Sequence, residues 1–317
     1  MLAFRRNHVF GIACAIMIAT GAGPSRADDC KQLIDSFNRA VEAGRENDAQ
    51  KLVDRIATDA QCGRFQALAQ RRLATFRLYG AQSLMARGRP VGDYERLLVE
   101  AERPHVLWQA SATLGDVRFG QRRFVEAAQA FDRTIEIVRN EALTPTPPTK
   151  FDVEGLFERA GQARLLAANA PLEKNANFVK TARNQRDGKL GGIYAPSVRG
   201  IVPRTIPIPI TFEFAKTAFT PVGEQAAREL VTALKEQGPS QVLLVGHTDV
   251  RGTEQINMKL SRERADVVAA FLRGNGVDAK VNTAGKGSTE PMRLTDASGL
   301  SQEDIYALNR RVEWRRP

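Results

Sequence analysis

The sequence predicts a protein of the α plus α/β class, with an all-helical N-terminal region followed by a C-terminal βαβαβ sandwich on a mixed sheet. Residues 31–170 are rich in Ala, Leu, Arg, Glu and Gln, and their apolar positions follow the helical period. Residues 206–317 instead alternate short β-branched runs with amphipathic segments, which is typical of helices packed on a sheet. Between them, residues 171–205 are rich in Asn, Gly, Lys and Arg and are predicted to form a linker.

The first 27 residues have the pattern of an export signal. Arg5 and Arg6 precede an apolar run at residues 9–22, and a small-x-small cleavage site ends at Ala27. The run is shorter than the roughly 18 residues of a membrane-spanning helix. Lipidation at Cys14 is disfavoured, because cleavage there would truncate the apolar run. We therefore expect an exported, periplasmic protein whose helical domain spans residues 28–170.

The charge and the cysteines restrict the function further. The formal net charge is +10, and three of the basic residues precede Asp28. Residues 206–317 carry 15 basic and 14 acidic side chains, so nearly all the excess that remains after signal removal lies between Asp28 and Thr205. No run of Lys and Arg is interleaved with aromatic residues, which disfavours nucleic-acid binding and favours a solvated basic surface. Cys30 and Cys62 remain after signal removal, and an even pair in an exported protein predicts a disulfide worth on the order of 3 kcal/mol. The alternative is two reduced, buried thiols.

Three or four helical pairs are predicted in the N-terminal region. The clearest unit covers residues 107–140, with its turn at Gly120, and weaker units cover residues 37–60 and 69–102. A further helix is predicted at 151–170. The small and aromatic positions of the clearest unit have the offsets of a tetratricopeptide repeat: Leu114, Gly115, Ala127 and Phe131. This pattern predicts a tetratricopeptide-like solenoid whose groove binds a partner protein, the alternative being a helical spacer without a ligand.

The stretch from residue 242 to residue 265 carries the side chains that point to a function. Residues 242–245 form a short apolar run typical of a buried strand, and Asp249 follows where that strand would leave the sheet. A helix is predicted to begin between residues 253 and 257. Asn257 and Arg264 fall on its apolar stripe, together with Leu260, Val267, Val268 and Phe271. An inward-facing arginine is either paired or directed at a ligand.

The remaining elements of the C-terminal domain follow from turn signals and apolar runs. Pro207 and Pro209 confine their stretch to an edge or pre-strand position. The predicted elements are a strand at 210–214, a helix from Thr220-Pro221 to Gly238, a strand at 280–284, a polar loop at 287–308 and a strand at 311–315.

The spacing of residues around Asp249 is specific. It reads GHTD-x-x-G-x4-N-x2-LS-x2-RA, followed later by Asn309-Arg310-Arg311-Val312, and comprises Gly246, His247, Thr248, Asp249, Gly252, Asn257, Leu260, Ser261, Arg264 and Ala265. Residues 206–316 thereby resemble the OmpA-like C-terminal domain, which anchors envelope proteins to peptidoglycan. The resemblance implies a non-enzymatic protein without a cofactor, associated with the cell wall and the outer membrane.

The resemblance also implies a binding site for the zwitterionic side-chain end of meso-diaminopimelate in the stem peptide. Asp249 would accept the ammonium group, and the fork of Arg264 would bind the carboxylate. Asn257 and Leu260 would lie beside the pocket, and Thr248 would line it. Arg310 and Arg311 would tie the last strand to the sheet.

Three alternatives stay open. Asp249 and Arg264 could form an internal salt bridge that only orders the loop. The domain could be an envelope scaffold that binds protein and has no affinity for the wall. Lys216 stands at a position where the family often has Asp, Asn or Ser, and its positive charge could change the affinity for the ligand and the preference among stem peptides. His247 could belong to a metal site or a wall-modifying enzyme, but no acidic or Cys cluster and no nucleophile motif accompanies it.

Overall fold

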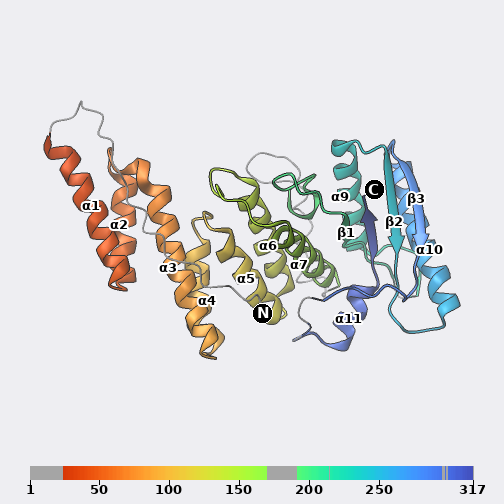
Figure 1. Ribbon diagram of the computed structural model, residues 1–317. Helices are drawn as coiled ribbons and strands as arrows, with labels where there is room; N and C mark the ends of the chain where they lie inside the picture. Colours follow the sequence, from red (N-terminus) through yellow and green to blue (C-terminus); the bar gives the residue numbers. More distant parts are fainter. Residues whose placement is uncertain (1–23, 170–190, 214, 295–296, 298, 317) are drawn as a thin grey trace. The chain divides into compact units, whose positions relative to one another are not determined.

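The computed structural model describes residues 24–169, 191–213, 215–294, 297 and 299–316 (Figure 1). Most of the predicted signal peptide (residues 1–23) and part of the predicted linker (170–190) lie outside the described residues. The chain divides into two compact units, Met1–Phe76 and Arg77–Pro317. No helix within the described ranges is long and apolar enough to cross a membrane.

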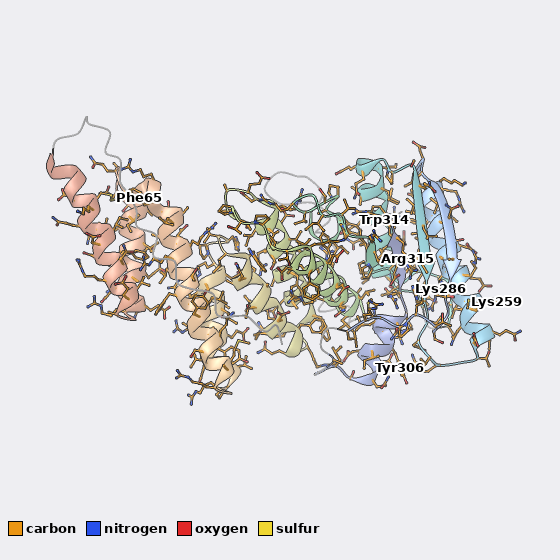
Figure 2. The ribbon with its side chains drawn as sticks, viewed as in Figure 1. Phe65, Lys259, Lys286, Tyr306, Trp314 and Arg315 are labelled. Carbon is orange, nitrogen blue, oxygen red and sulfur yellow. A yellow bond between two sulfur atoms is a disulfide. The ribbon has the colours of Figure 1, made fainter. Side chains whose placement is uncertain are left out.

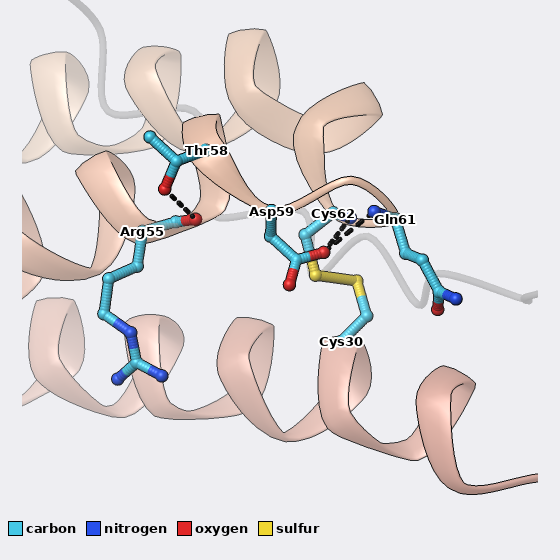
Figure 3. The surroundings of a disulfide bond; sticks show 6 residues. All are labelled: Cys30, Arg55, Thr58, Asp59, Gln61 and Cys62. Carbon is cyan, nitrogen blue, oxygen red and sulfur yellow. Dashed lines mark hydrogen bonds between the residues drawn. A yellow bond between two sulfur atoms is a disulfide. The ribbon is translucent and has the colours of Figure 1, made fainter.

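The first unit is a small helical bundle closed by a disulfide. It contains α1 (Pro24–Glu42), α2 (Glu46–Thr58), a 3-10 turn (Gly63–Phe65) and the start of α3 (Gln66–Ala86). Cys30 and Cys62 form the predicted disulfide, with their Cα atoms 5.5 Å apart (Figure 3). The Asp59 carboxylate accepts hydrogen bonds from the backbone N–H groups of Gln61 and Cys62, both at 2.8 Å, so it orders the turn that presents Cys62.

The second unit begins with the remaining helices. These are the end of α3, α4 (Val91–Glu102), α5 (Trp108–Gly120), α6 (Phe124–Arg139) and α7 (Lys150–Ala168), which confirms the predicted helical region. Gly115 on α5 admits the Phe131 ring of α6, because a Cβ added at Gly115 would lie 2.6 Å from that ring. The two helices therefore pack as the small-residue pattern predicts. Their assignment to the tetratricopeptide class stays a prediction.

A mixed sheet of four strands completes the second unit. Its strands are β1 (Thr205–Ile208), β2 (Gln241–Gly246), β3 (Lys280–Gly285) and β4 (Val312–Arg315), in the order β1-β4-β2-β3. The β2–β3 pair is parallel, and β4 is antiparallel to β1 and β2. Helix α9 (Pro221–Gln237) connects β1 to β2, and helix α10 (Glu254–Gly274) connects β2 to β3. Both connections join parallel strands and run the same way across the sheet, so right-handed crossovers place the two helices on one face. The predicted α plus α/β class is confirmed.

Two predicted elements are wrong. The first strand is β1 at Thr205–Ile208, not residues 210–214, and it includes Pro207. Pro207 is tolerated because β1 lies at the edge of the sheet, where a missing N–H leaves no ladder partner unpaired. The polar loop at 287–308 contains α11 (Gln302–Asn309), which Ser301 and Asp304 start with a capping box. This helix is too short and too polar for hydrophobic periodicity to reveal it.

Helix α7 packs against the second face of the sheet. A Cβ added at Gly161 would lie 2.9 Å from the Pro207 ring, and Gln162 Nε2 donates to the Arg293 carbonyl oxygen at 2.8 Å. Residues of α6, α7, α9, α10 and of strands β1, β2 and β4 belong to one hydrophobic core. This core also includes Ile193 and Tyr194 from the predicted linker. Helices and sheet therefore share a core in the second unit, while the predicted domain boundaries stay a prediction.

Candidate functional site

The site forms where β2 ends against the start of α10. Gly246 lets the two backbones approach, because a Cβ at this position would lie 2.0 Å from the Ser261 carbonyl oxygen. Gly252 then turns the chain with a φ of +95°, and the Thr253 hydroxyl accepts from the Ile256 N–H at 3.3 Å to cap α10. The chain therefore reverses direction here, and the residues just after β2 lie beside the first turns of α10.

Asp249 is buried in this turn with its carboxylate fully engaged. Its Oδ1 accepts from the Arg251 backbone N–H at 3.0 Å and from Arg251 Nε at 3.2 Å. Its Oδ2 accepts from Arg251 Nη2 at 2.6 Å and from Arg310 Nη1 at 2.8 Å. Burial raises the pKa of Asp249, but the hydrogen bonds from Arg251 and Arg310 outweigh it and lower the pKa to about 2. Asp249 is therefore an anion at neutral pH.

Arg264 is buried on α10 and has no counter-ion among the described residues. Its Nε donates to the Lys216 carbonyl oxygen at 3.1 Å, and its Cζ lies 4.9 Å from the centre of the Phe212 ring. In the described part of the chain no carboxylate forms an ion pair with it. Burial, and then the positive charge of Arg310, lower the pKa of the Arg264 guanidinium to about 10, against the opposing effect of Asp249. The side chain stays charged at neutral pH in a desolvated position.

The two predicted charges are thus near each other but unpaired. Asp249 influences the pKa of Arg264, yet its hydrogen bonds go to Arg251 and Arg310. A direct Asp249–Arg264 salt bridge, one of the open alternatives, is absent from the described contacts. The assignment of the two residues to a ligand stays a prediction.

The other predicted site residues support the turn. Asn257 is buried, and its Nδ2 donates to the Asp249 carbonyl oxygen at 3.3 Å, which fixes the backbone of the acid. The Thr248 hydroxyl is buried without a hydrogen-bond partner among the described residues. The Thr248 backbone N–H donates to the Gly287 carbonyl oxygen at 2.9 Å. Leu260 is half-buried. The exposed Lys216 side chain is paired with Glu213 at 2.7 Å, so much of its added charge is neutralised.

Arg251, Arg310, Glu303 and Tyr306 complete the site, and sequence reasoning did not place them there. Arg310 Nη2 donates to Glu303 Oε1 at 2.8 Å. This arginine therefore belongs to the site, whereas the family resemblance predicts that it ties the last strand to the sheet. Arg311 directly precedes β4, and its Nε donates to Glu313 on that strand at 2.8 Å, so its role in tying the strand to the sheet stays a prediction. Figure 2 shows Tyr306 on α11, the helix missed in the polar loop. The sequence signal for that helix was the capping box at Ser301.

His247 lies beside Glu313 of β4. It is fully buried, with Nε2 3.3 Å from Glu313 Oε2, and burial chiefly lowers its pKa against the opposing effect of Glu313. Within the described ranges no group of three or more His, Cys, Asp or Glu side chains could hold a metal ion. The side chain belongs to a charged network with Glu313 and Arg311 beneath the sheet's second face.

A cavity of about 670 Å³ lies away from Asp249 and Arg264, between α7, β1, β4 and residues 290–293. Its lining mixes acids and arginines, and several of these already pair with one another, such as Arg315 with Glu290 at 2.6 Å and Arg311 with Glu313 at 2.7 Å. We therefore place the candidate site at the turn after β2 and not in this cavity.

Comparison with known proteins locates a family domain in the same region. The model described as the OmpA family matches residues 211–303. A photosystem I chlorophyll a apoprotein of Gloeobacter violaceus is 34% identical over 156 residues, which cover 48% of this chain and 18% of the relative. Probable lipoprotein YiaD of Escherichia coli is 37% identical (34% of this chain, 48% of the relative), and outer membrane protein A of Bordetella avium is 38% identical (32% and 50%).

The chain therefore spans half or less of the length of these curated relatives. Among solved structures, the peptidoglycan-associated lipoprotein from Burkholderia pseudomallei is 26% identical, with a TM-score of 0.29, over 35% of this chain and 88% of that one. Together with the mixed sheet and its crossover helices, the family match establishes that residues 211–303 lie in an OmpA-like domain.

Proposed function

We propose that this protein binds peptidoglycan without cleaving it, by holding the zwitterionic side-chain end of diaminopimelate in a stem peptide. The observation that carries the proposal is Arg264, a buried cation with no carboxylate partner among the described residues. Burying an unpaired charge is unfavourable, and a ligand carboxylate in that position would remove the penalty. The OmpA-like domain supports the same function class.

The charges around Arg264 match both ends of such a ligand. Arg310 lies close enough to lower the pKa of Arg264, so an anion seated near the two guanidinium groups would relieve their mutual repulsion. The Asp249 carboxylate provides the acceptor for an ammonium group. A site that offers one acid and one excess cation favours a zwitterion over a simple cation or anion.

The helical region and the location of the protein complete the proposal. The helices before the sheet would bind another envelope protein, and attachment to the wall would raise the local concentration of that partner. The proposed export signal would deliver the chain to the periplasm of a Gram-negative bacterium, with cleavage after Ala27.

The proposal is tested by co-sedimentation of the full-length protein with purified sacculi. Arg264→Ala and Asp249→Ala should each reduce binding by about 10- to 100-fold, the effect of losing one charge-assisted hydrogen bond pair. Arg262→Ala is the matched control, because Arg262 is an exposed arginine on the same helix that donates to the Thr283 carbonyl oxygen at 2.6 Å. Circular dichroism checks the folding of each variant. Binding by Arg264→Ala as strong as wild type would refute the site.

One observation favours a second function, a scaffold whose OmpA-like domain binds protein and not the wall. The Asp249 carboxylate is already saturated by Arg251 and Arg310, which is what a purely structural acid would look like. The same assay separates the two functions, since the scaffold predicts that the wild-type protein stays in the supernatant with sacculi of any stem composition.

A further inference from the structure

The Asp249 carboxylate has no free acceptor position in this conformation. A carboxylate offers about four lone-pair sites. Here Oδ1 receives the Arg251 backbone N–H and Nε, and Oδ2 receives Arg251 Nη2 and Arg310 Nη1, at distances of 2.6–3.2 Å. The Asp249 side chain is 8% exposed. An incoming ammonium group must therefore displace a donor before it can bind.

Arg251 is the donor that can leave. Its side chain is 45% exposed, compared with 24% for Arg310. Arg310 also reaches Glu303 at 2.8 Å and so is held from two sides. Water can solvate the exposed Arg251 guanidinium when it leaves Asp249, and it can do so less well for Arg310, so Arg251 is the donor that costs less to exchange for another cation.

A second set of partners is already in place for Arg251. Its Nη1 lies 3.4 Å from Glu303 Oε2, and its Cζ lies 4.5 Å from the centre of the Tyr306 ring. Both partners come from α11. A guanidinium that left Asp249 could tighten its contact with Glu303 and keep its stacking on Tyr306. The side chain therefore has one set of contacts to give up and another to retain.

We propose that Arg251 is a specificity-determining gate, which occupies Asp249 in the free protein and yields to the ammonium group of a zwitterionic ligand. This inference rests on the proposed function. The exchange conserves charge, because one cation replaces another on Asp249 while Arg251 stays on Glu303. A ligand that has a carboxylate but no ammonium group cannot displace Arg251, so the gate favours zwitterions and admits them with reduced affinity.

The gate is tested by isothermal titration of the full-length protein with meso-diaminopimelate and with pimelate, which lacks both ammonium groups. Arg251→Ala should bind meso-diaminopimelate at least threefold more tightly than wild type and should bind pimelate no more tightly. Arg262→Ala is again the control for the loss of one positive charge from the surface. Weaker or unchanged binding of meso-diaminopimelate by Arg251→Ala overturns the gate.

The same titrations distinguish this failure from a failure of the proposed function. If wild type binds meso-diaminopimelate and Arg264→Ala does not, the site stands whatever Arg251→Ala does. If neither wild type nor Arg251→Ala binds, both proposals fall.

Substituting Glu303→Gln tests whether Arg251 moves onto Glu303 when the ligand binds, which a merely structural Arg251 would not do. It should weaken binding of meso-diaminopimelate in the wild-type background, because displaced Arg251 loses its second partner. The effect should be smaller in the Arg251→Ala background, and equal effects in both backgrounds count against the gate.

Discussion

Asp249 combines burial with an unusually stable negative charge. The two arginines that surround it come from different places, Arg251 from the same turn and Arg310 from the end of α11. Their hydrogen bonds, against the effect of burial, hold the pKa of the acid at about 2. The charge is therefore linked to the folding of the whole region, because in the unfolded chain Asp249 has neither partner.

This linkage predicts a specific pH dependence for Asp249→Asn. A lowered pKa stabilises the fold fully above the unfolded-state value of about 3.9, and the contribution disappears as pH falls toward 2. Thermal unfolding should show wild type more stable than the variant by a constant margin at pH 7 and pH 5, and by a smaller margin at pH 3. A margin that is the same at pH 3 as at pH 7 would contradict the assigned pKa.

The site residues divide into those that sequence could identify and those that it could not. Asp249, Arg264 and Asn257 were identifiable because their spacing places them on one strand end and one helix face. Arg251 and Glu303 lie 52 positions apart, and they meet only because α11 folds over the turn. No local pattern encodes that contact. Arg310 was identified by its motif but given the wrong role, since motif position does not say which way a side chain points.

Among the elements, the disulfide-closed bundle of the first unit has a hydrophobic core of its own. This core consists of Phe37 and of small and aliphatic side chains from α1, α2 and the start of α3, together with Cys62. The helices were predictable from periodicity and the disulfide from the even cysteine count. By contrast, β1 was misplaced because the two prolines suggested that the strand begins after them, whereas an edge position tolerates Pro207 within it.

Removing the disulfide should destabilise the first unit alone. The double variant Cys30→Ser/Cys62→Ser should lose on the order of 3 kcal/mol of unfolding free energy, because the bridge closes a separation of 32 residues. Trp108 and Trp314 are the two tryptophans of the chain and both belong to the second unit, so fluorescence reports that unit only. Urea unfolding should shift the circular dichroism signal to lower urea and leave the fluorescence transition unchanged. A shift of both transitions would show that the two units unfold together.

At the scale of the whole second unit, helices and sheet are bound into one body. Arg122 on the turn after α5 forms an ion pair with Asp304 of α11, and α7 contacts β1 through Gly161 and Pro207. Composition alone suggested a separation at residues 171–205. It could not show that Ile193 and Tyr194 are fully buried, because burial of a polar stretch depends on what packs over it.

Two glycines of α7 test whether this packing stabilises the unit. Alanine at either position gains up to about 1 kcal/mol of helix propensity. At Gly155 the added Cβ meets no atom within 4 Å, whereas at Gly161 it lies 2.9 Å from the Pro207 ring. Gly155→Ala should raise the midpoint of the tryptophan fluorescence transition, and Gly161→Ala should lower it. Equal increases would mean that α7 and the sheet unfold independently.

The contact between Gly161 and Pro207 also has a mechanical consequence. A force applied to α4 or α5 reaches the sheet through side-chain packing at α7 as well as along the backbone. The ladder between β1 and β4 lies across the strands, so a pull along β1 is shared by several hydrogen bonds at once. If the OmpA-like domain is fixed to the wall, the helices that pack on it move with it, and a force on these helices is transmitted to the wall.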